Sequence, residues 1–198
     1  MKSICKYDFF DHETFEKISS FVFEKIKDPN AVSYAEHFKK YYGIVFLPKE
    51  LREVLLDKAQ KETKDNSLEI IYSQVVKYQI KDNITPELLK HKDKENLGEW
   101  VMDIVIDSTI DWPLFIEDQD FKNLPNSVFF IKGDEDWHWR PEFPSKDESD
   151  YVILLFVHLA NKDSKYARVS RQIFGMEEKA LNSFLKAVRP TWGQYNEK

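Results

Sequence analysis

The chain has little glycine and almost no cysteine, and each scarcity excludes a class of site. Only five glycines and one cysteine occur in 198 residues. Phosphate-binding loops need glycine because the backbone must approach the ligand closely, so we expect no nucleotide-binding loop. Neither a Walker loop nor a Gly-x-Gly-x-x-Gly pattern occurs. Cys5 alone cannot form an internal disulfide, so the cysteine content gives no sign of an oxidising compartment.

Long apolar runs are also missing. The longest extends from Tyr151 to Val157, far short of the ~20 residues that span a bilayer. The first ten residues contain no apolar stretch of signal-peptide length. We therefore expect a cytoplasmic protein without membrane contact. The net charge of −6 argues against general binding to nucleic acid.

The common motifs of metal sites and nucleophilic enzymes are absent. The five histidines are scattered, and no His-x-x-x-His, His-Glu-x-x-His or Cys-x-x-Cys spacing occurs. No Gly-x-Ser-x-Gly elbow occurs either. A di-iron carboxylate bundle would need Glu-x-x-His pairs, which this chain lacks. We therefore expect neither a bound metal nor a cofactor.

The most informative feature present is an acidic segment at residues 99–150. It holds 14 Asp and Glu against four Lys and Arg, whereas the other residues hold 21 acids and 25 bases. Four of the five tryptophans lie inside it: Trp100, Trp112, Trp137 and Trp139. Carboxylates mixed with large aromatic side chains are typical of a surface that binds a basic partner.

Apolar spacing predicts helices through the first two thirds of the chain. Capping residues, Pro positions and helical periodicity place them at 11–28, 33–43, 48–59, 66–76, 85–89 and 97–108. The first would be capped by Asp11, and the second and fourth by capping boxes that begin at Ser33 and Asn66.

The pattern changes near Trp112. Runs of Val, Ile and Phe predict strands at 128–131 and 151–159, with a third possible at 166–174 before a last helix at 176–188. The expected fold class is α+β, with mostly helical N-terminal two thirds, a small antiparallel sheet and a closing C-terminal helix. We treat residues 1–198 as a single domain, with a possible helical subregion at 1–111 and a sheet-containing subregion at 112–198.

Acidic residues recur every four positions in the predicted helix at 97–108. Glu99, Asp103 and Asp107 would form one exposed stripe opposite an inward-facing Trp100. One interpretation is a solvated face, and the other is a docking stripe for a basic surface. We expect these three carboxylates to contact the partner.

Residues 133–141 are the densest group of polar and aromatic side chains. If this segment is a strand, Trp137 and Trp139 share one face, while Asp136, His138 and Arg140 share the other. Three interpretations remain: an edge strand packed on the core, an interaction loop, and an active site with His138 as general base. As an interaction loop it would contribute Asp134, Glu135, Asp136, Trp137, His138, Trp139 and Arg140.

Basic residues after position 160 balance the acidic segment, and pairing between the two within one fold is a better explanation than a nucleic-acid patch. Our leading hypothesis is a non-enzymatic protein that sequesters a basic partner, such as a bacterial immunity protein that neutralises a cationic nuclease-type toxin. The alternative is a hydrolase or transferase with Asp136, His138 and Arg140 in its cleft. The sequence leaves the oligomeric state open.

Overall fold

The computed structural model describes residues 3–93, 99–164 and 167–168. In this part of the chain strands predominate, and the helical elements are few. The elements, in chain order, are β1 (Ile4–Lys6), α1 (His12–Lys27), β2 (Ser33–Ala35), the 3-10 helix η1 (Glu36–Phe38), β3 (Lys40–Val45), α2 (Lys49–Thr63), β4 (Leu68–Gln79), β5 (Leu88–His91), β6 (Trp100–Ser108), β7 (Leu114–Ile116), β8 (Gln119–Phe121), β9 (Val128–Ile131), β10 (His138–Arg140) and β11 (Tyr151–Asn161).

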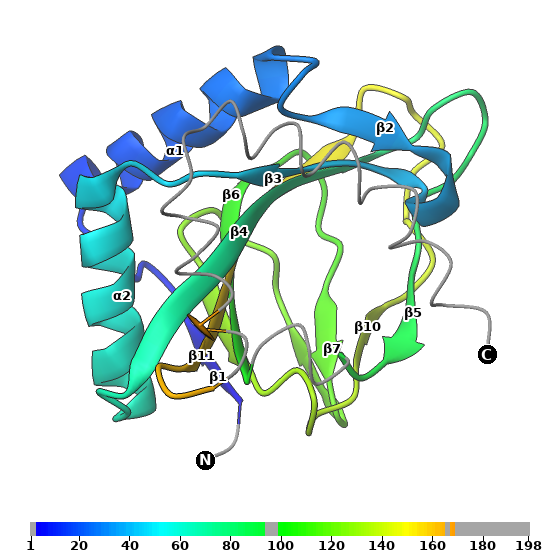
Figure 1. Ribbon diagram of the computed structural model, residues 1–198. Helices are drawn as coiled ribbons and strands as arrows, with labels where there is room; N and C mark the ends of the chain where they lie inside the picture. Colours follow the sequence, from blue (N-terminus) through cyan, green and yellow to red (C-terminus); the bar gives the residue numbers. More distant parts are fainter. Residues whose placement is uncertain (1–2, 94–98, 165–166, 169–198) are drawn as a thin grey trace.

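Two antiparallel sheets face each other. The large sheet has seven strands in the order β1-β9-β6-β11-β4-β3-β2, and the small sheet has four in the order β5-β10-β7-β8. Figure 1 shows α1 and α2 on one side of the large sheet and β5, β7 and β10 on the other. The molecule therefore has three layers: helices, a large sheet and a small sheet.

Each side of the large sheet has its own apolar core. Toward the helices, Ile104 of β6 and Leu155 of β11 pack with residues such as Ile18 and Leu55. Toward the small sheet, the neighbouring residues of the same strands join a second core that includes Trp112. Because β6 and β11 are covered on both faces, most of their residues are buried.

The prediction of a helical N-terminal two thirds is wrong. The segments expected as helices at 33–43, 66–76, 85–89 and 97–108 contain β2 to β6, with only the short η1 among them. A spacing of four is even, so Trp100 and Ile104 share a face in a strand as well as in a helix. Burial on both faces of β6 removes the alternation that would have distinguished the two.

Several local predictions are confirmed. Asp11 caps α1, accepting a hydrogen bond from the backbone N–H of Thr14 at 2.9 Å. The helix predicted after Pro48 is α2, and the predicted strands at 128–131 and 151–159 are β9 and β11. The closing helix at 176–188 and nearly all of the possible strand at 166–174 lie outside the described residues.

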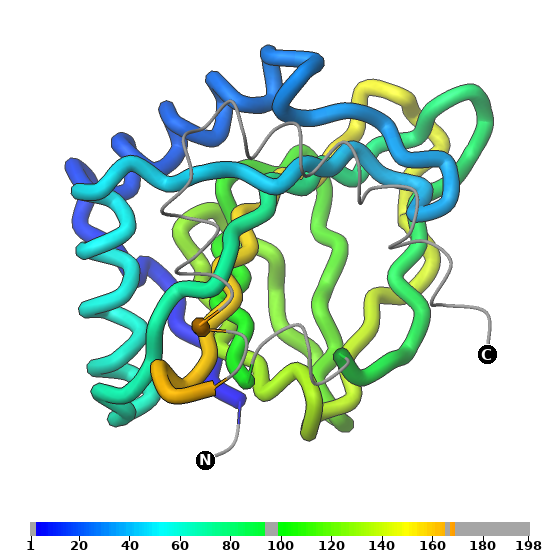
Figure 2. Tube along the Cα trace, viewed as in Figure 1, coloured from blue at the N-terminus to red at the C-terminus, as the bar shows by residue number. Residues whose placement is uncertain are grey.

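Strand pairing brings together segments that are far apart in the chain. β5 and β10 are neighbours in the small sheet, with His91 opposite His138, and Figure 2 shows the two segments running side by side. Neither α1 nor α2, nor any other helix of the described residues, has the length and hydropathy to cross a membrane.

Candidate metal centre

Three potential metal ligands meet where β5 ends and β10 begins. The ligand atoms of His91, Asp93 and His138 all lie within 4.8 Å of one another. Oδ1 of Asp93 is 3.6 Å from Nε2 of His91 and 3.8 Å from Nε2 of His138. These separations are too long for direct hydrogen bonds. The three ligand atoms therefore converge on a common point without forming hydrogen bonds to one another.

The sheet topology fixes this convergence. His91 is the last residue of β5, and His138, the first residue of β10, lies opposite it in the antiparallel register. Asp93 lies two residues after His91 in the chain, and its backbone N–H donates to the carbonyl of Gly133 at 2.6 Å. A register shift between His138 and Arg140 marks a bulge in the pairing, a feature that often occurs beside functional sites.

Backbone hydrogen bonds define which nitrogen of each imidazole is free. Nδ1 of His91 lies 2.7 Å from the carbonyl oxygen of Leu89, and Nδ1 of His138 lies 3.0 Å from that of Asp136. A carbonyl only accepts, so Nδ1 of each ring carries the proton and donates it. The Nε2 lone pairs are therefore left to bind a cation, an arrangement found in metal-ligating histidines.

Burial favours the neutral form of His91. Desolvation, and then the neighbouring His138, lower the pKa of His91 below its ordinary value. A neutral imidazole is the form that binds metal. Two imidazoles and one carboxylate, with the remaining positions open, form the donor set of mononuclear non-heme iron(II) sites.

A substitution at Gly133 should weaken metal binding without altering a ligand. A Cβ on this residue would lie 2.4 Å from Oδ2 and 2.9 Å from Cβ of Asp93, so Gly133→Ala should displace that carboxylate. We expect a ~10–100-fold loss of affinity for a divalent metal, the range typical of residues that orient ligands. Calorimetric titration of the metal-free protein with Fe²⁺ or Zn²⁺ measures this loss. Asp134→Ala, at the exposed neighbouring position, is the control, and equal affinities in the two variants would contradict the prediction.

Behind the three ligands, a buried charged pair crosses from one sheet to the other. Arg140 of β10 lies 3.7 Å from Asp103 of β6 (Nη2 to Oδ2), and both side chains are almost fully buried. Nη1 of Arg140 donates to the carbonyl of Trp112, and the guanidinium lies 5.2 Å from the Trp112 ring centroid. Among the described residues, Nε and Nη2 of Arg140 and Oδ1 of Asp103 have no hydrogen-bond partner.

Because Arg140 lies near Asp103 without a hydrogen bond to it, burial has the larger effect on the pKa of the Asp103 carboxyl group. Burial raises the pKa of Asp103 to about 7, against the opposing effects of Arg140 and Lys40. Nζ of Lys40 lies 3.4 Å from the hydroxyl of Tyr78. Two cationic side chains, the buried Arg140 and the partly exposed Lys40, therefore act on the carboxyl group of Asp103.

The structure separates the residues that were expected to form one partner-binding surface. His138 and Arg140 share a face, as the alternation predicts, and this face is the buried one rather than that of the tryptophans. Asp103 is 2% exposed, so its expected exposure is wrong. Asp107 accepts a hydrogen bond from the hydroxyl of Tyr151 at 2.7 Å. Trp100 is buried, as predicted.

The tryptophans of residues 133–141 lie on the outer face of the small sheet. Trp137 is 42% exposed, and Trp139 stacks on Phe115 with ring centroids 5.2 Å apart. Nζ of Lys90 lies 4.3 Å from the Trp139 ring centroid and Nζ of Lys92 lies 5.4 Å from that of Trp137. These lysines extend along the aromatic rings, so the outer face of the small sheet presents both cationic and aromatic groups.

The acidic side chains of this segment have local partners or face solvent. Asp136 accepts from the hydroxyl of Ser3, and Glu135 pairs with Lys132 at 2.5 Å. Asp134 and Glu99 are exposed. Asp136 therefore does not join His138 and Arg140 in the interior, and the carboxylate that meets His138 belongs to Asp93.

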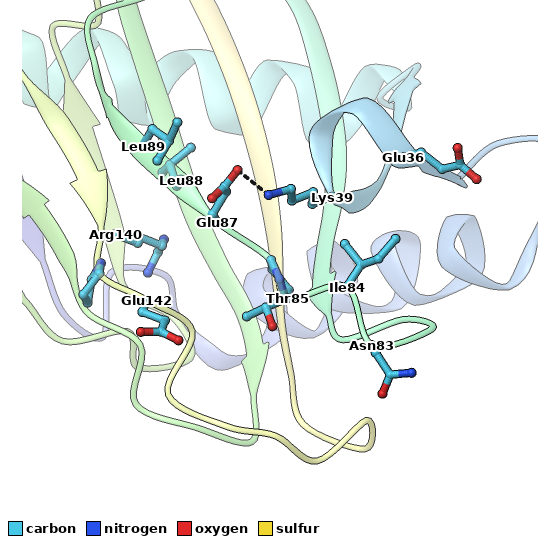
Figure 3. Close-up of a pocket in the computed structure, with 12 residues that line it drawn as sticks. Glu36, Lys39, Asn83, Ile84, Thr85, Glu87, Leu88, Leu89, Arg140 and Glu142 are labelled. Carbon is cyan, nitrogen blue, oxygen red and sulfur yellow. Dashed lines mark hydrogen bonds and ion pairs between the residues drawn. The ribbon is translucent and has the colours of Figure 1, made fainter.

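A pocket of about 700 Å³ opens beside the small sheet, and none of the three metal-ligand candidates lines it. Figure 3 shows Arg140 and Glu142 on one side of the view and Glu36 on the other, with Thr85 and Glu87 between them and a dashed line for the Lys39–Glu87 ion pair. Arg140 is thus shared between this pocket and the buried charged pair.

Sequence reasoning missed His91 and Asp93 because it searched only for His and Cys spacings. A His and an Asp two residues apart at a strand end project toward the same side, and this signal is present in His91-Lys92-Asp93. Pairing that couple with His138 requires the β5–β10 contact, which joins segments almost 50 residues apart.

Comparison with solved structures shows the fold. No family model and no curated protein matches the chain. The non-heme alpha ketoglutarate dependent epimerase SnoN from nogalamycin biosynthesis is similar, with a TM-score of 0.64 at 6% identity over 80% of this chain and 78% of SnoN. A prolyl-4-hydroxylase from Pseudomonas putida gives 0.60 at 8% identity, covering 79% and 90%. HygX from Streptomyces hygroscopicus, solved with nickel and 2-oxoglutarate, gives 0.59 at 8% identity, covering 81% and 83%.

These findings correct the functional hypothesis. The chain shares the fold of these three solved structures, and it has a His-Asp-His cluster where β5 meets β10. The prediction of a non-enzymatic immunity protein with a basic toxin partner is therefore wrong. The alternative of a hydrolase or transferase is not matched by these structures either.

Proposed function

We propose that this protein is a mononuclear non-heme iron enzyme that uses a 2-oxo acid, such as 2-oxoglutarate, to oxidise an organic substrate. The observation that carries the proposal is the cluster of His91, Asp93 and His138. SnoN, which shares the fold, has been solved in complex with Fe3+ and alpha ketoglutarate. The single Cys5 agrees with a cytoplasmic location, where ferrous iron and thiols stay reduced.

The residues present fit such an iron site. Two Nε2 atoms and one carboxylate are available, and each imidazole is held by a backbone carbonyl. Ferrous iron, when bound, would supply the reactivity toward dioxygen. Protein side chains alone do not provide this reactivity. The carboxylate of Asp93 offsets one of the two positive charges of the metal ion.

The protein itself positions the metal ligands, provides charged groups near them and keeps water away from one side of the site. β5 and β10 hold the two histidines on a sheet, and the backbone N–H of Asp93, two residues after β5, is bonded to the carbonyl of Gly133, so that all three ligands are held in place. The apolar core around Trp112, Phe129 and Leu154 lies between the two sheets behind the ligands. An apolar interior on that side strengthens the attraction between a bound acid and buried cations.

The proposal is tested by reconstituting the metal-free protein anaerobically with Fe²⁺. Elemental analysis after desalting should find about one iron per chain, because the described residues contain one such donor cluster. On admission of air, oxygen uptake should require both iron and 2-oxoglutarate. Zinc-loaded protein is the control, since Zn²⁺ occupies His and carboxylate sites but has no redox chemistry. Failure to retain iron, or uptake that does not depend on 2-oxoglutarate, would contradict the proposal.

A further inference from the structure

The turn at residues 132–136, between β9 and β10, contacts two of the three metal-ligand candidates. The carbonyl of Gly133 accepts the backbone N–H of Asp93 at 2.6 Å. The carbonyl of Asp136 lies 3.0 Å from Nδ1 of His138 and accepts its proton. The position of this turn therefore sets both the place of the carboxylate and the orientation of one imidazole.

Ser3, the residue before β1, joins the two ends of this turn. Its hydroxyl donates to the carboxylate of Asp136 and accepts the backbone N–H of Lys132 at 3.1 Å. A hydroxyl has one proton and two lone pairs, so both bonds form at once. The antiparallel register brings Ser3 to this place, because Ile4 lies opposite Phe130 and the residue before Ile4 therefore meets the end of β9.

The two bonds of Ser3 connect the turn to the large sheet, whereas other contacts of the turn are internal. Glu135 pairs with Lys132 at 2.5 Å, and both belong to the turn, so this ion pair does not fix the turn relative to the strands. The side chain of Asp134 is exposed. Ser3 is different, because the residues that follow it are paired with β9 along the whole of β1.

We propose that Ser3 is a positioning residue of the metal centre, which acts through the turn at 132–136 on Asp93 and His138. The inference rests on the proposed function, because it takes the cluster to be a metal site. Ser3 bonds to neither ligand side chain. Its hydroxyl keeps the turn in one place, and the two carbonyls of the turn then hold the carboxylate and the imidazole in positions that suit a single metal ion.

The first measurement is the affinity of the metal-free protein for Co²⁺, by calorimetric titration. Ser3→Ala should weaken binding by about 3- to 10-fold, which is less than the ~10–100-fold typical of groups that bond to a ligand directly. Ser3→Thr keeps the hydroxyl and should bind Co²⁺ as the wild-type protein does. The matched control is Ser145→Ala, since the Ser145 hydroxyl also accepts a backbone N–H, that of Asp147 at 2.9 Å, but lies between β10 and β11. Equal affinities in Ser3→Ala and Ser145→Ala would overturn the inference.

Two further measurements separate positioning from a general loss of stability. The visible absorption of bound Co²⁺ reports the arrangement of its ligands, so the spectrum of Ser3→Ala at saturating Co²⁺ should differ from that of the wild-type protein. In the metal-free protein, the backbone N–H of Asp93 should exchange with solvent faster in Ser3→Ala, because its bond to Gly133 opens more often. A variant that is only less stable would show the wild-type spectrum once saturated, and this result would overturn the inference.

A double-mutant cycle tests whether Ser3 acts through the turn. Asp136→Ala removes the carboxylate that accepts from Ser3 but keeps the carbonyl that holds His138. In Ser3→Ala this carboxylate has already lost its bond to the hydroxyl, so adding Asp136→Ala should lower the affinity for Co²⁺ little further. If the losses of the two single variants multiply in the double variant, the two residues act independently and the inference is overturned.

Failure of the inference is distinguishable from failure of the proposed function. If the wild-type protein binds one Co²⁺ per chain and Ser3→Ala binds it equally well, only the role of Ser3 is contradicted and the proposed function stands. If the wild-type protein binds no divalent metal, the proposed function itself is contradicted. Hydrogen exchange at Asp93 needs no metal, so it tests the connection between Ser3 and the turn in either case.

Discussion

Replacement of His138 by alanine should abolish stoichiometric iron binding and the oxygen uptake that depends on it. His138 supplies one of only two imidazoles in the cluster, and its ring is held by the carbonyl of Asp136. Residues that only orient a ligand contribute ~10–100-fold to metal affinity, so loss of a ligand should exceed ~100-fold. Calorimetry with Fe²⁺ under anaerobic conditions measures this loss, and oxygen consumption reports the activity.

Two further variants make the result specific. Asp93→Ala should behave like His138→Ala, because each removes one of three donors. His37→Ala removes an exposed histidine of η1 outside the cluster and should bind iron as the wild-type protein does. Circular dichroism must show that each variant is folded. Stoichiometric iron in folded His138→Ala would show that the metal site lies elsewhere.

The sequence predicts α1, α2, β9 and β11, but not β4 and β6, the two strands that flank β11 in the large sheet. Asp11 and Pro48 mark the starts of α1 and α2, and both signals act locally. β6 is different, because the residues of β9 and β11 that cover its edges are distant in the chain. Its even spacing of apolar residues fits a helix and a strand equally, and only knowledge of the flanking strands decides between them.

The candidate site shows the same division between local and non-local information. The alternation at residues 138–140 correctly predicts that His138 and Arg140 share a face. It does not reveal that Asp93 rather than Asp136 is the carboxylate beside His138. It also does not reveal that Asp103 is buried against Arg140, because an acidic residue every four positions is more often a solvated face. Charge pattern alone thus led to a surface interpretation for residues that lie inside.

The largest effect on stability is expected at Gly43, where β3 passes the segment that precedes β2. A Cβ on Gly43 would lie 1.8 Å from the carbonyl oxygen of Ala31 and 2.8 Å from its carbon. The obstructing atoms belong to the backbone, and the adjacent Val32 is buried in the core on the helix side of the sheet. Gly43→Ala therefore cannot be accommodated by a change of rotamer, and it must move one segment away from the other.

Displacement of β3 would also disturb the large sheet, because Gly43 lies opposite the fully buried Val75 of β4. We expect Gly43→Ala to lower the free energy of unfolding by ~4 kcal/mol or more, in the range of severe backbone and packing defects. For a domain of this size, that corresponds to a fall in Tm of roughly 8–16 °C. Thermal unfolding followed by circular dichroism measures the change, with Glu36→Ala at an exposed position of η1 expected to stay within ~0.5 kcal/mol of wild type. If the Tm of Gly43→Ala equals that of the control, residues 31 and 43 can move apart without loss of stability. This result would contradict the prediction, which depends on the close packing of these two segments.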